Sequence, residues 1–107
     1  MSSSLQTPTT LRFELLCDRQ FALSVIGAAI KEFGAHDSTL PGLPVSYSFD
    51  LEAPPEGPQE IARRCMIERW LVAQGCKATV WRARGYYLYK LQSSLDDIDG
   101  TTAPEGP

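Results

Sequence analysis

The sequence predicts an α+β two-layer domain with the element order β-α-β-α-β-β, in which two helices cover one face of a four-stranded sheet. Three observations predict this class. Two stretches alternate apolar and polar residues, two others carry apolar residues at helical spacing and end at a glycine, and a late segment is rich in aromatic and β-branched residues. A length of 107 residues fits one small domain.

The two ends of the chain differ in composition from its middle. Residues 1–10 and 93–107 are polar and rich in Ser, Thr, Pro or Gly, with few side chains to bury. We therefore expect a disordered N-terminal arm over 1–10, a single folded domain over 11–92 and a disordered acidic tail over 93–107.

The first strand and helix are predicted over residues 11–17 and 19–33. Alternation in 11–17 favours a half-buried strand, Asp18 has a side chain suited to capping a helix, and Gly34 suits the left-handed position after a helix end. The helix carries one broad apolar stripe, which predicts packing on the sheet. Its members are Ala22, Val25, Ile26, Ala29, Ile30 and Phe33.

A loop over residues 35–43 precedes the second predicted strand, in which Val45, Tyr47, Phe49 and Leu51 alternate with polar residues. The second helix is predicted over 58–74, with Pro58 in the first turn and Gly75 after the end. Helical projection predicts a core face of Ile61, Ala62, Cys65, Met66, Val72 and Ala73. The same projection places Arg63, Arg64 and Glu68 toward water and Arg69 inside the apolar arc.

Residues 77–83 and 86–92 are predicted to form a hairpin that turns near Arg84-Gly85. A bulged loop or one long bent strand is the alternative, because Arg-Gly is a weak turn signal. With a two-residue turn, one face carries Val80, Arg82, Tyr87, Tyr89 and Leu91. The other face carries Thr79, Trp81, Leu88 and Lys90.

Charge is distributed unevenly along the chain. The net charge is -3, yet residues 61–92 contain seven basic residues and one acidic residue, Glu68. The segments on both sides are acidic. A local excess of positive charge predicts a surface that attracts a partner of opposite charge.

The sequence offers little material for catalysis. His36, Asp37 and Ser38 are adjacent in the chain, so they cannot form the line of nucleophile, base and orienting acid that a hydrolase needs. Three cysteines without paired spacing predict free, mostly buried thiols in a reducing cytoplasm, with no metal site. We expect no enzyme activity and no cofactor. The start of the chain does not resemble a signal peptide, and no apolar run is long enough to span a membrane.

We therefore predict a small non-catalytic protein-interaction module, an adaptor or inhibitor that docks on a larger protein, with a profile common among proteins of mobile genetic elements. The alternative is an accessory protein that binds single-stranded DNA or RNA through the same face. The hairpin aromatics have a competing role in the core, and the sequence does not decide which hairpin face is buried. The predicted binding residues are Arg63, Arg64, Trp81, Arg82, Arg84, Tyr86, Tyr87, Tyr89 and Lys90.

Overall fold

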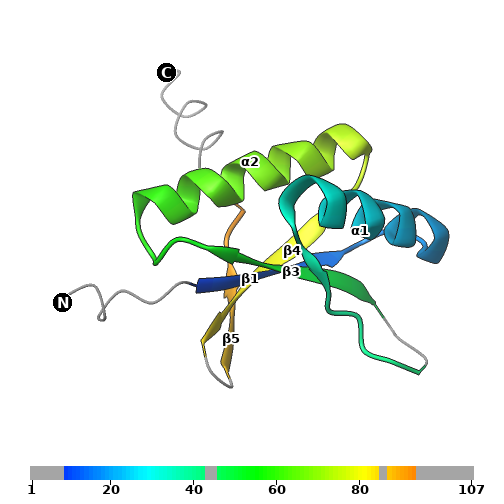
Figure 1. The fold of residues 1–107 in the computed structure, drawn as a ribbon, viewed down its shortest axis with the longest axis horizontal. Helices are drawn as coiled ribbons and strands as arrows, with labels where there is room; N and C mark the ends of the chain where they lie inside the picture. The colour runs from blue at the N-terminus through cyan, green and yellow to red at the C-terminus, as the bar shows by residue number, and fades with distance from the viewer. Residues whose placement is uncertain (1–8, 43–45, 85–86, 94–107) are drawn as a thin grey trace, which may run out of the picture.

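A computed structural model describes residues 9–42, 46–84 and 87–93. Two helices lie together on one face of a five-stranded sheet (Figure 1). The elements in chain order are β1 (Thr9–Leu15), α1 (Arg19–Phe33), β2 (His36–Asp37), β3 (Tyr47–Ala53), α2 (Pro58–Gln74), β4 (Ala78–Arg84) and β5 (Tyr87–Leu91). The α+β class is confirmed, whereas the predicted count of four strands is wrong.

The sheet has the strand order β2-β3-β1-β4-β5, and every neighbouring pair is antiparallel. The additional strand, β2, lies inside the predicted 35–43 loop. It has only two residues, which is too short to show the alternation that identifies a strand in sequence. Because β1 and β3 are antiparallel, the handedness rule for parallel crossovers does not apply to α1.

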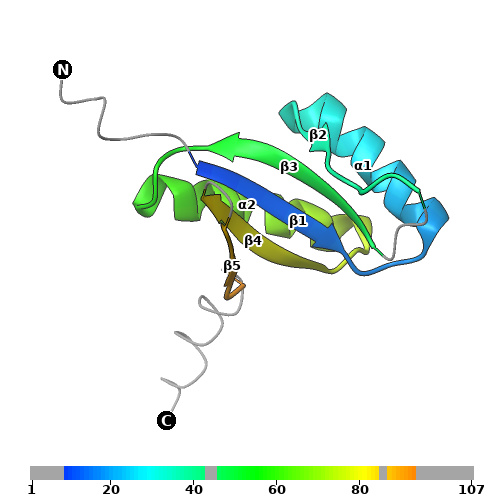
Figure 2. The ribbon, with the colours of Figure 1, turned by 90° about the horizontal axis from the view of Figure 1, so that it is seen from below.

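The core fills the space between the sheet and the helices. Phe13 of β1 and Phe49 of β3 are register partners, and their rings stack with centroids 5.2 Å apart. Phe33 of α1 meets Trp70 of α2 edge to face at 5.1 Å. In the described part of the chain, no helix lies on the opposite face of the sheet (Figure 2). The protein therefore has one covered and one open sheet face.

Helix α1 forms as the sequence predicts. The Asp18 side chain accepts a hydrogen bond from the amide of Phe21 at 2.9 Å, and Gly34 closes the helix with φ of 72°. Ala22, Val25, Ile26 and Ala29 are buried against the strands. Ile30 of the predicted stripe is instead partly exposed.

Helix α2 begins at Pro58 and ends before Gly75, as predicted, but the side of the helix that faces the sheet is opposite to the predicted one. Its buried residues are Glu60, Arg64, Ile67, Glu68 and Leu71. Most of the predicted core face lies in solvent, with Cys65 half-buried and Ile61, Ala62, Met66, Val72 and Ala73 exposed. The charged side of this helix thus faces the sheet.

Candidate interaction surface

The reversed orientation of α2 is explained by Arg82, which β4 directs toward the helices. Register pairs Arg82 with Leu11, a fully buried residue on the covered face of β1. A guanidinium in this position needs acidic partners, because its charge is removed from water. Its Nη2 atom donates to Glu60 Oε1 at 3.2 Å, and its Nη1 atom lies 3.4 Å from Glu56 Oε2. An acidic side of α2 therefore has to face the sheet.

Three α2 side chains continue this cluster at intervals of one helical turn. Arg64 Nη1 lies 3.8 Å from Glu60 Oε2, and Arg64 Nε lies 4.0 Å from Glu68 Oε2. Glu68 also accepts a hydrogen bond of 2.6 Å from Ser93, a residue that we predicted to belong to the tail. We call Glu60, Arg64, Glu68 and Arg82 the buried charge ladder. Its opposite charges balance, so it offers no excess charge to a partner.

The structure divides the predicted binding residues between several environments. Arg64 and Arg82 belong to the buried charge ladder. The prediction that Arg64 faces water is wrong, because Arg64 is buried. Arg84 is exposed, with Nη1 4.0 Å from Glu56 Oε1. Arg63 is half-buried on the flank of α2. Tyr86 lies outside the described residues.

The hairpin distributes its residues over two faces as predicted, but its register differs. Arg84, which was predicted to lie in the turn, belongs to β4 and pairs with Tyr87, and Trp81 pairs with Lys90. Its aromatic residues therefore lie on two different faces of the sheet. Tyr87 and Tyr89 share the covered face with Arg82, and their rings lie 6.4 Å apart. Both tyrosines remain exposed, so they contribute little to the core. Trp81 and Lys90 lie on the open face, and no single surface holds all the predicted aromatic and basic residues.

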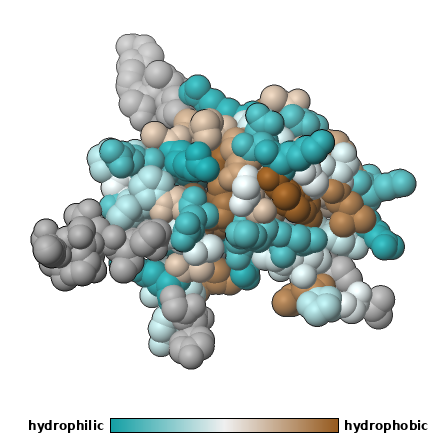
Figure 3. Space-filling view, in the orientation of Figure 1, coloured by the Kyte–Doolittle hydropathy of each residue, from teal (hydrophilic) through white to brown (hydrophobic). Residues whose placement is uncertain are grey.

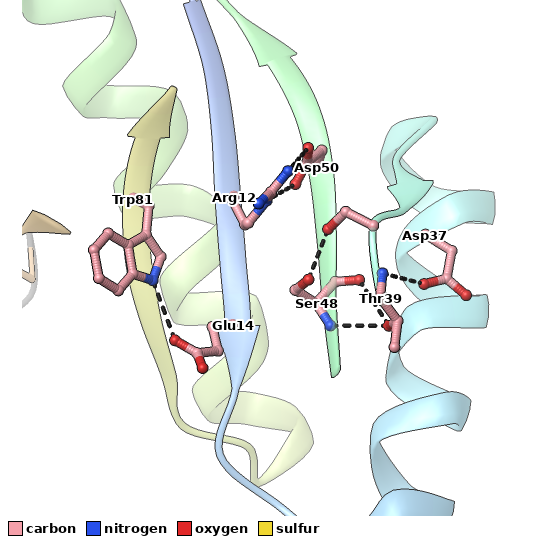
Figure 4. Close-up of polar contacts among 8 residues, drawn as sticks. Arg12, Glu14, Asp37, Thr39, Ser48, Asp50 and Trp81 are labelled. Atoms are coloured by element: carbon pink, nitrogen blue, oxygen red, sulfur yellow. Dashed lines mark hydrogen bonds and ion pairs between the residues drawn. The ribbon is translucent and has the colours of Figure 1, made fainter. Parts of the chain in front are cut away.

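The open face consists largely of polar side chains that bind one another (Figure 4). Arg12 donates to Asp50 through two hydrogen bonds of 2.8 and 3.0 Å, and these bonds raise the Arg12 pKa above its usual value. Trp81 donates from its indole nitrogen to Glu14 at 3.2 Å. The charges of Arg12 and Asp50 and the indole N–H of Trp81 are therefore satisfied within the sheet.

The same close-up shows a polar edge where β2 meets β3 (Figure 4). Ser38 and Ser48 hydroxyls lie 2.7 Å apart, and the Ser48 amide donates to the Thr39 hydroxyl at 3.1 Å. Asp37 accepts from the Thr39 amide at 2.9 Å, so Asp37 shapes the turn after β2. His36 pairs with Asp50 in the β2–β3 ladder, and the Ser38 amide donates to the Ser48 carbonyl at 3.0 Å.

The outward side of α2 is the surface that our reading of the sequence missed. Ile61, Met66 and Val72 are exposed there, at 48%, 44% and 59%. Figure 3 shows hydrophobic surface over the helical layer, interrupted by hydrophilic side chains. We call Ile61, Cys65, Met66, Arg69 and Val72 the α2 outward face. The sequence signal that identifies it is the Glu60, Arg64, Glu68 spacing of four residues, which marks the opposite side as an ion-pair ladder.

The α2 outward face is also positively charged. Helix α2 contains five charged residues, and its two acids, Glu60 and Glu68, are both buried. Arg69 is exposed, and Arg63 is half-buried on the flank of the helix. Within the part of the chain that the structure describes, neither arginine is in an ion pair. The face therefore combines apolar side chains with positive charge that no acidic residue of the described ranges pairs with.

The comparisons with family models, curated proteins and solved structures find no match to this chain. Among the described residues, no group of three or more His, Cys, Asp or Glu side chains is placed to hold a metal ion. No helix in the described ranges is both long and apolar enough to cross a membrane.

Proposed function

We propose that this protein is a non-catalytic interaction module that docks on a larger protein through the α2 outward face. The observation that carries the proposal is the orientation of α2, which turns Ile61, Met66 and Val72 to solvent while it buries Glu60, Arg64 and Glu68. Full burial of one such apolar side chain is worth roughly 1.5–3 kcal/mol. A partner that covers this face would recover that free energy.

The chemistry of the face specifies the partner. Ile61, Cys65 and Val72 follow one another at spacings of four and seven residues, so they form one stripe of the helix. Such a stripe fits an apolar groove, as in other helix-in-groove complexes. Arg69 within the face and Arg63 beside it favour acidic groups around that groove, because complementary charge steers docking and selects the partner. We therefore propose an apolar groove with an acidic rim, on a protein larger than this one. Adaptor and inhibitor are both roles that such docking would serve.

The structure weakens the nucleic-acid alternative. Of the seven basic residues in 61–92, Arg64, Arg82 and Arg84 lie in ion pairs with Glu56, Glu60 or Glu68. Ion pairs therefore neutralise three of the seven positive charges of this segment. Single-strand binding needs aromatic rings and free cations along one groove. Here Trp81 and the two tyrosines lie on opposite faces of the sheet.

Site-directed cross-linking followed by titration tests the proposal. A photo-reactive amino acid replaces Val72 in one protein and Leu40, an exposed loop residue, in the matched control. Irradiation in the native host should attach one defined protein to position 72 and not to position 40. That protein, once purified, should bind the wild type and the Leu40→Asp variant equally. Val72→Asp should weaken its Kd at least tenfold with an unchanged melting temperature.

Two results would contradict the proposal. One is equal affinity of Val72→Asp and wild type for the captured protein, which would place the binding surface elsewhere. The other is binding of random oligonucleotides at micromolar or lower Kd that weakens steeply with salt, as phosphate contacts require. Fluorescence anisotropy of single-stranded and duplex oligonucleotides at two salt concentrations measures the second. We expect flat curves.

A further inference from the structure

Two cysteines that are distant in the sequence lie in contact at one end of the sheet. Cys17 Sγ and Cys76 Sγ are 3.5 Å apart, although 59 positions separate the residues. Cys17 follows β1 and precedes the Asp18 cap of α1, whereas Cys76 follows Gly75 at the end of α2 and precedes β4. The two cysteines therefore lie side by side in the β1–α1 and α2–β4 connections.

The backbone holds this pair in position. The antiparallel ladder of β1 and β4 pairs Leu15 with Ala78, and the Leu16 amide donates to the Lys77 carbonyl at 2.8 Å one step beyond. Cys17 and Cys76 are the next residues on the two chains. A disulfide requires sulfur atoms about 2.05 Å apart. Side-chain rotation over a gap of this size brings them together while the strands stay paired.

We propose that Cys17 and Cys76 are a redox-active dithiol that closes to an intramolecular disulfide in the presence of a disulfide oxidant such as oxidised glutathione. This inference is independent of the proposed function, since it depends only on the contact between the two cysteines. Cys65, the third cysteine, is not in contact with either sulfur in the described structure and takes no part.

The different exposure of the two thiols sets the order of reaction. Cys17 is half-exposed, so its thiolate attacks one sulfur of oxidised glutathione, forms a mixed disulfide and releases one glutathione thiolate. Cys76 is buried. It loses its proton to solvent and attacks the Cys17 sulfur, which forms the intramolecular bond and releases the second glutathione thiolate. Two protein thiols are oxidised and one glutathione disulfide is reduced.

The second step is expected to be slow and to depend on pH. Burial, followed by the hydrogen bond to Cys17, raises the pKa of the Cys76 thiol to about 12. The thiolate is the attacking species, so closure should accelerate roughly tenfold per pH unit while this step limits the rate. In the described structure the titratable group in contact with Cys76 is the Cys17 thiol itself.

The test uses the full chain with Cys65→Ser, which leaves the proposed pair as its two cysteines. The reduced protein is incubated with oxidised glutathione at pH 7 and at pH 9, and intact mass is followed over time. We expect a glutathione adduct that converts, faster at pH 9, to a monomer lighter than the starting protein by two hydrogen atoms. The closed loop is long, so the oxidised protein should melt about 10 °C or more above its reduced form.

The decisive sample keeps both cysteines, so the result does not depend on the folding of a variant at buried Cys76. Cys17→Ser is the matched control and should never lose two hydrogen atoms as a monomer. A glutathione adduct that does not close in the Cys65→Ser protein would overturn the proposal. Disulfide-linked dimers as the product, or an oxidised monomer that melts below the reduced one, would overturn it as well.

Discussion

The two helices cover the same face of the sheet, but α1 turns an apolar stripe toward the strands whereas α2 turns charged residues toward them. Ala22, Val25, Ile26 and Ala29 make the buried side of α1. The buried side of α2 combines Ile67 and Leu71 with the buried charge ladder. Packing of apolar groups explains α1 by itself, whereas α2 needs both packing and ion pairing.

Arg82 is the source of this difference. The strands beneath α1 present apolar side chains, but β4 presents a guanidinium beside β5 and the end of the sheet. Charges removed from water are tolerated when they are paired and hydrogen-bonded. Among the described residues, three ladder atoms have no hydrogen-bond partner: Glu60 Oε2, Arg64 Nε and Arg82 Nε. Buried water would satisfy these atoms.

The largest expected effect comes from breaking the ladder. Arg64→Ala should lower the free energy of unfolding by about 3–5 kcal/mol, because it leaves Glu60 and Glu68 buried without their shared partner. Urea denaturation with linear extrapolation measures it. The matched control is Arg63→Ala, next to it on the same helix, which should change stability by less than about 0.5 kcal/mol. A loss for Arg64→Ala as small as the one expected for Arg63→Ala would show that Arg64 faces solvent.

A smaller difference in stability is expected when the same residue type, isoleucine, is shortened in each helix. Ile26 of α1 is 3% exposed, whereas Ile61 of α2 is 48% exposed. Ile26→Ala should cost about 2–5 kcal/mol in unfolding free energy, from lost burial and the cavity left behind. Ile61→Ala should cost less than about 1 kcal/mol, since its side chain already contacts water.

The measurement is again urea denaturation, on variants made in the same background. The substitutions sharpen the comparison because the chemical change is identical and only the helix differs. A cost at Ile61 as large as that at Ile26 would mean that the outward face is covered in the free protein, for example by a second copy of the chain. Dependence of the unfolding midpoint on protein concentration would then identify that copy.

Prediction from the sequence succeeded for the buried side of α1 and failed for the buried side of α2. For α1 the cap, the stripe and the terminal glycine all agree, so local signals suffice. For α2 the ranking of residues by hydrophobicity places Ile61 inside and Arg64 outside. What decides the buried side of α2 is a tertiary contact, the position of Arg82 under the helix. Alternation in the hairpin predicts that Arg82 shares a face with Val80, but it does not predict which element packs on that face.

Other features depended on long-range register in the same way. The contact of Cys17 with Cys76 arises from the pairing of β1 with β4. These strands are far apart in the sequence, since β1 ends at Leu15 and β4 begins at Ala78. The positive excess of residues 61–92 was a count along the chain, and it omitted Glu56 and Glu60, which precede the segment. Both acids bind Arg82 in space. Segment charge predicts surface charge only where ion pairs stay within the segment.

The smallest of these effects concerns how each helix begins. Asp18 supplies a side-chain acceptor to α1, whereas Gly57 precedes α2 with no side-chain cap. Asp18→Ala should therefore cost about 1 kcal/mol, seen as a drop of roughly 4–8 °C in melting temperature. Gln59→Ala, in the exposed first turn of α2, is the matched control and should leave the melting temperature nearly unchanged. Asp18→Asn retains an acceptor oxygen and should restore most of the loss. An Asn variant as unstable as the Ala variant would instead assign the effect to the negative charge of Asp18 at the helix N-terminus.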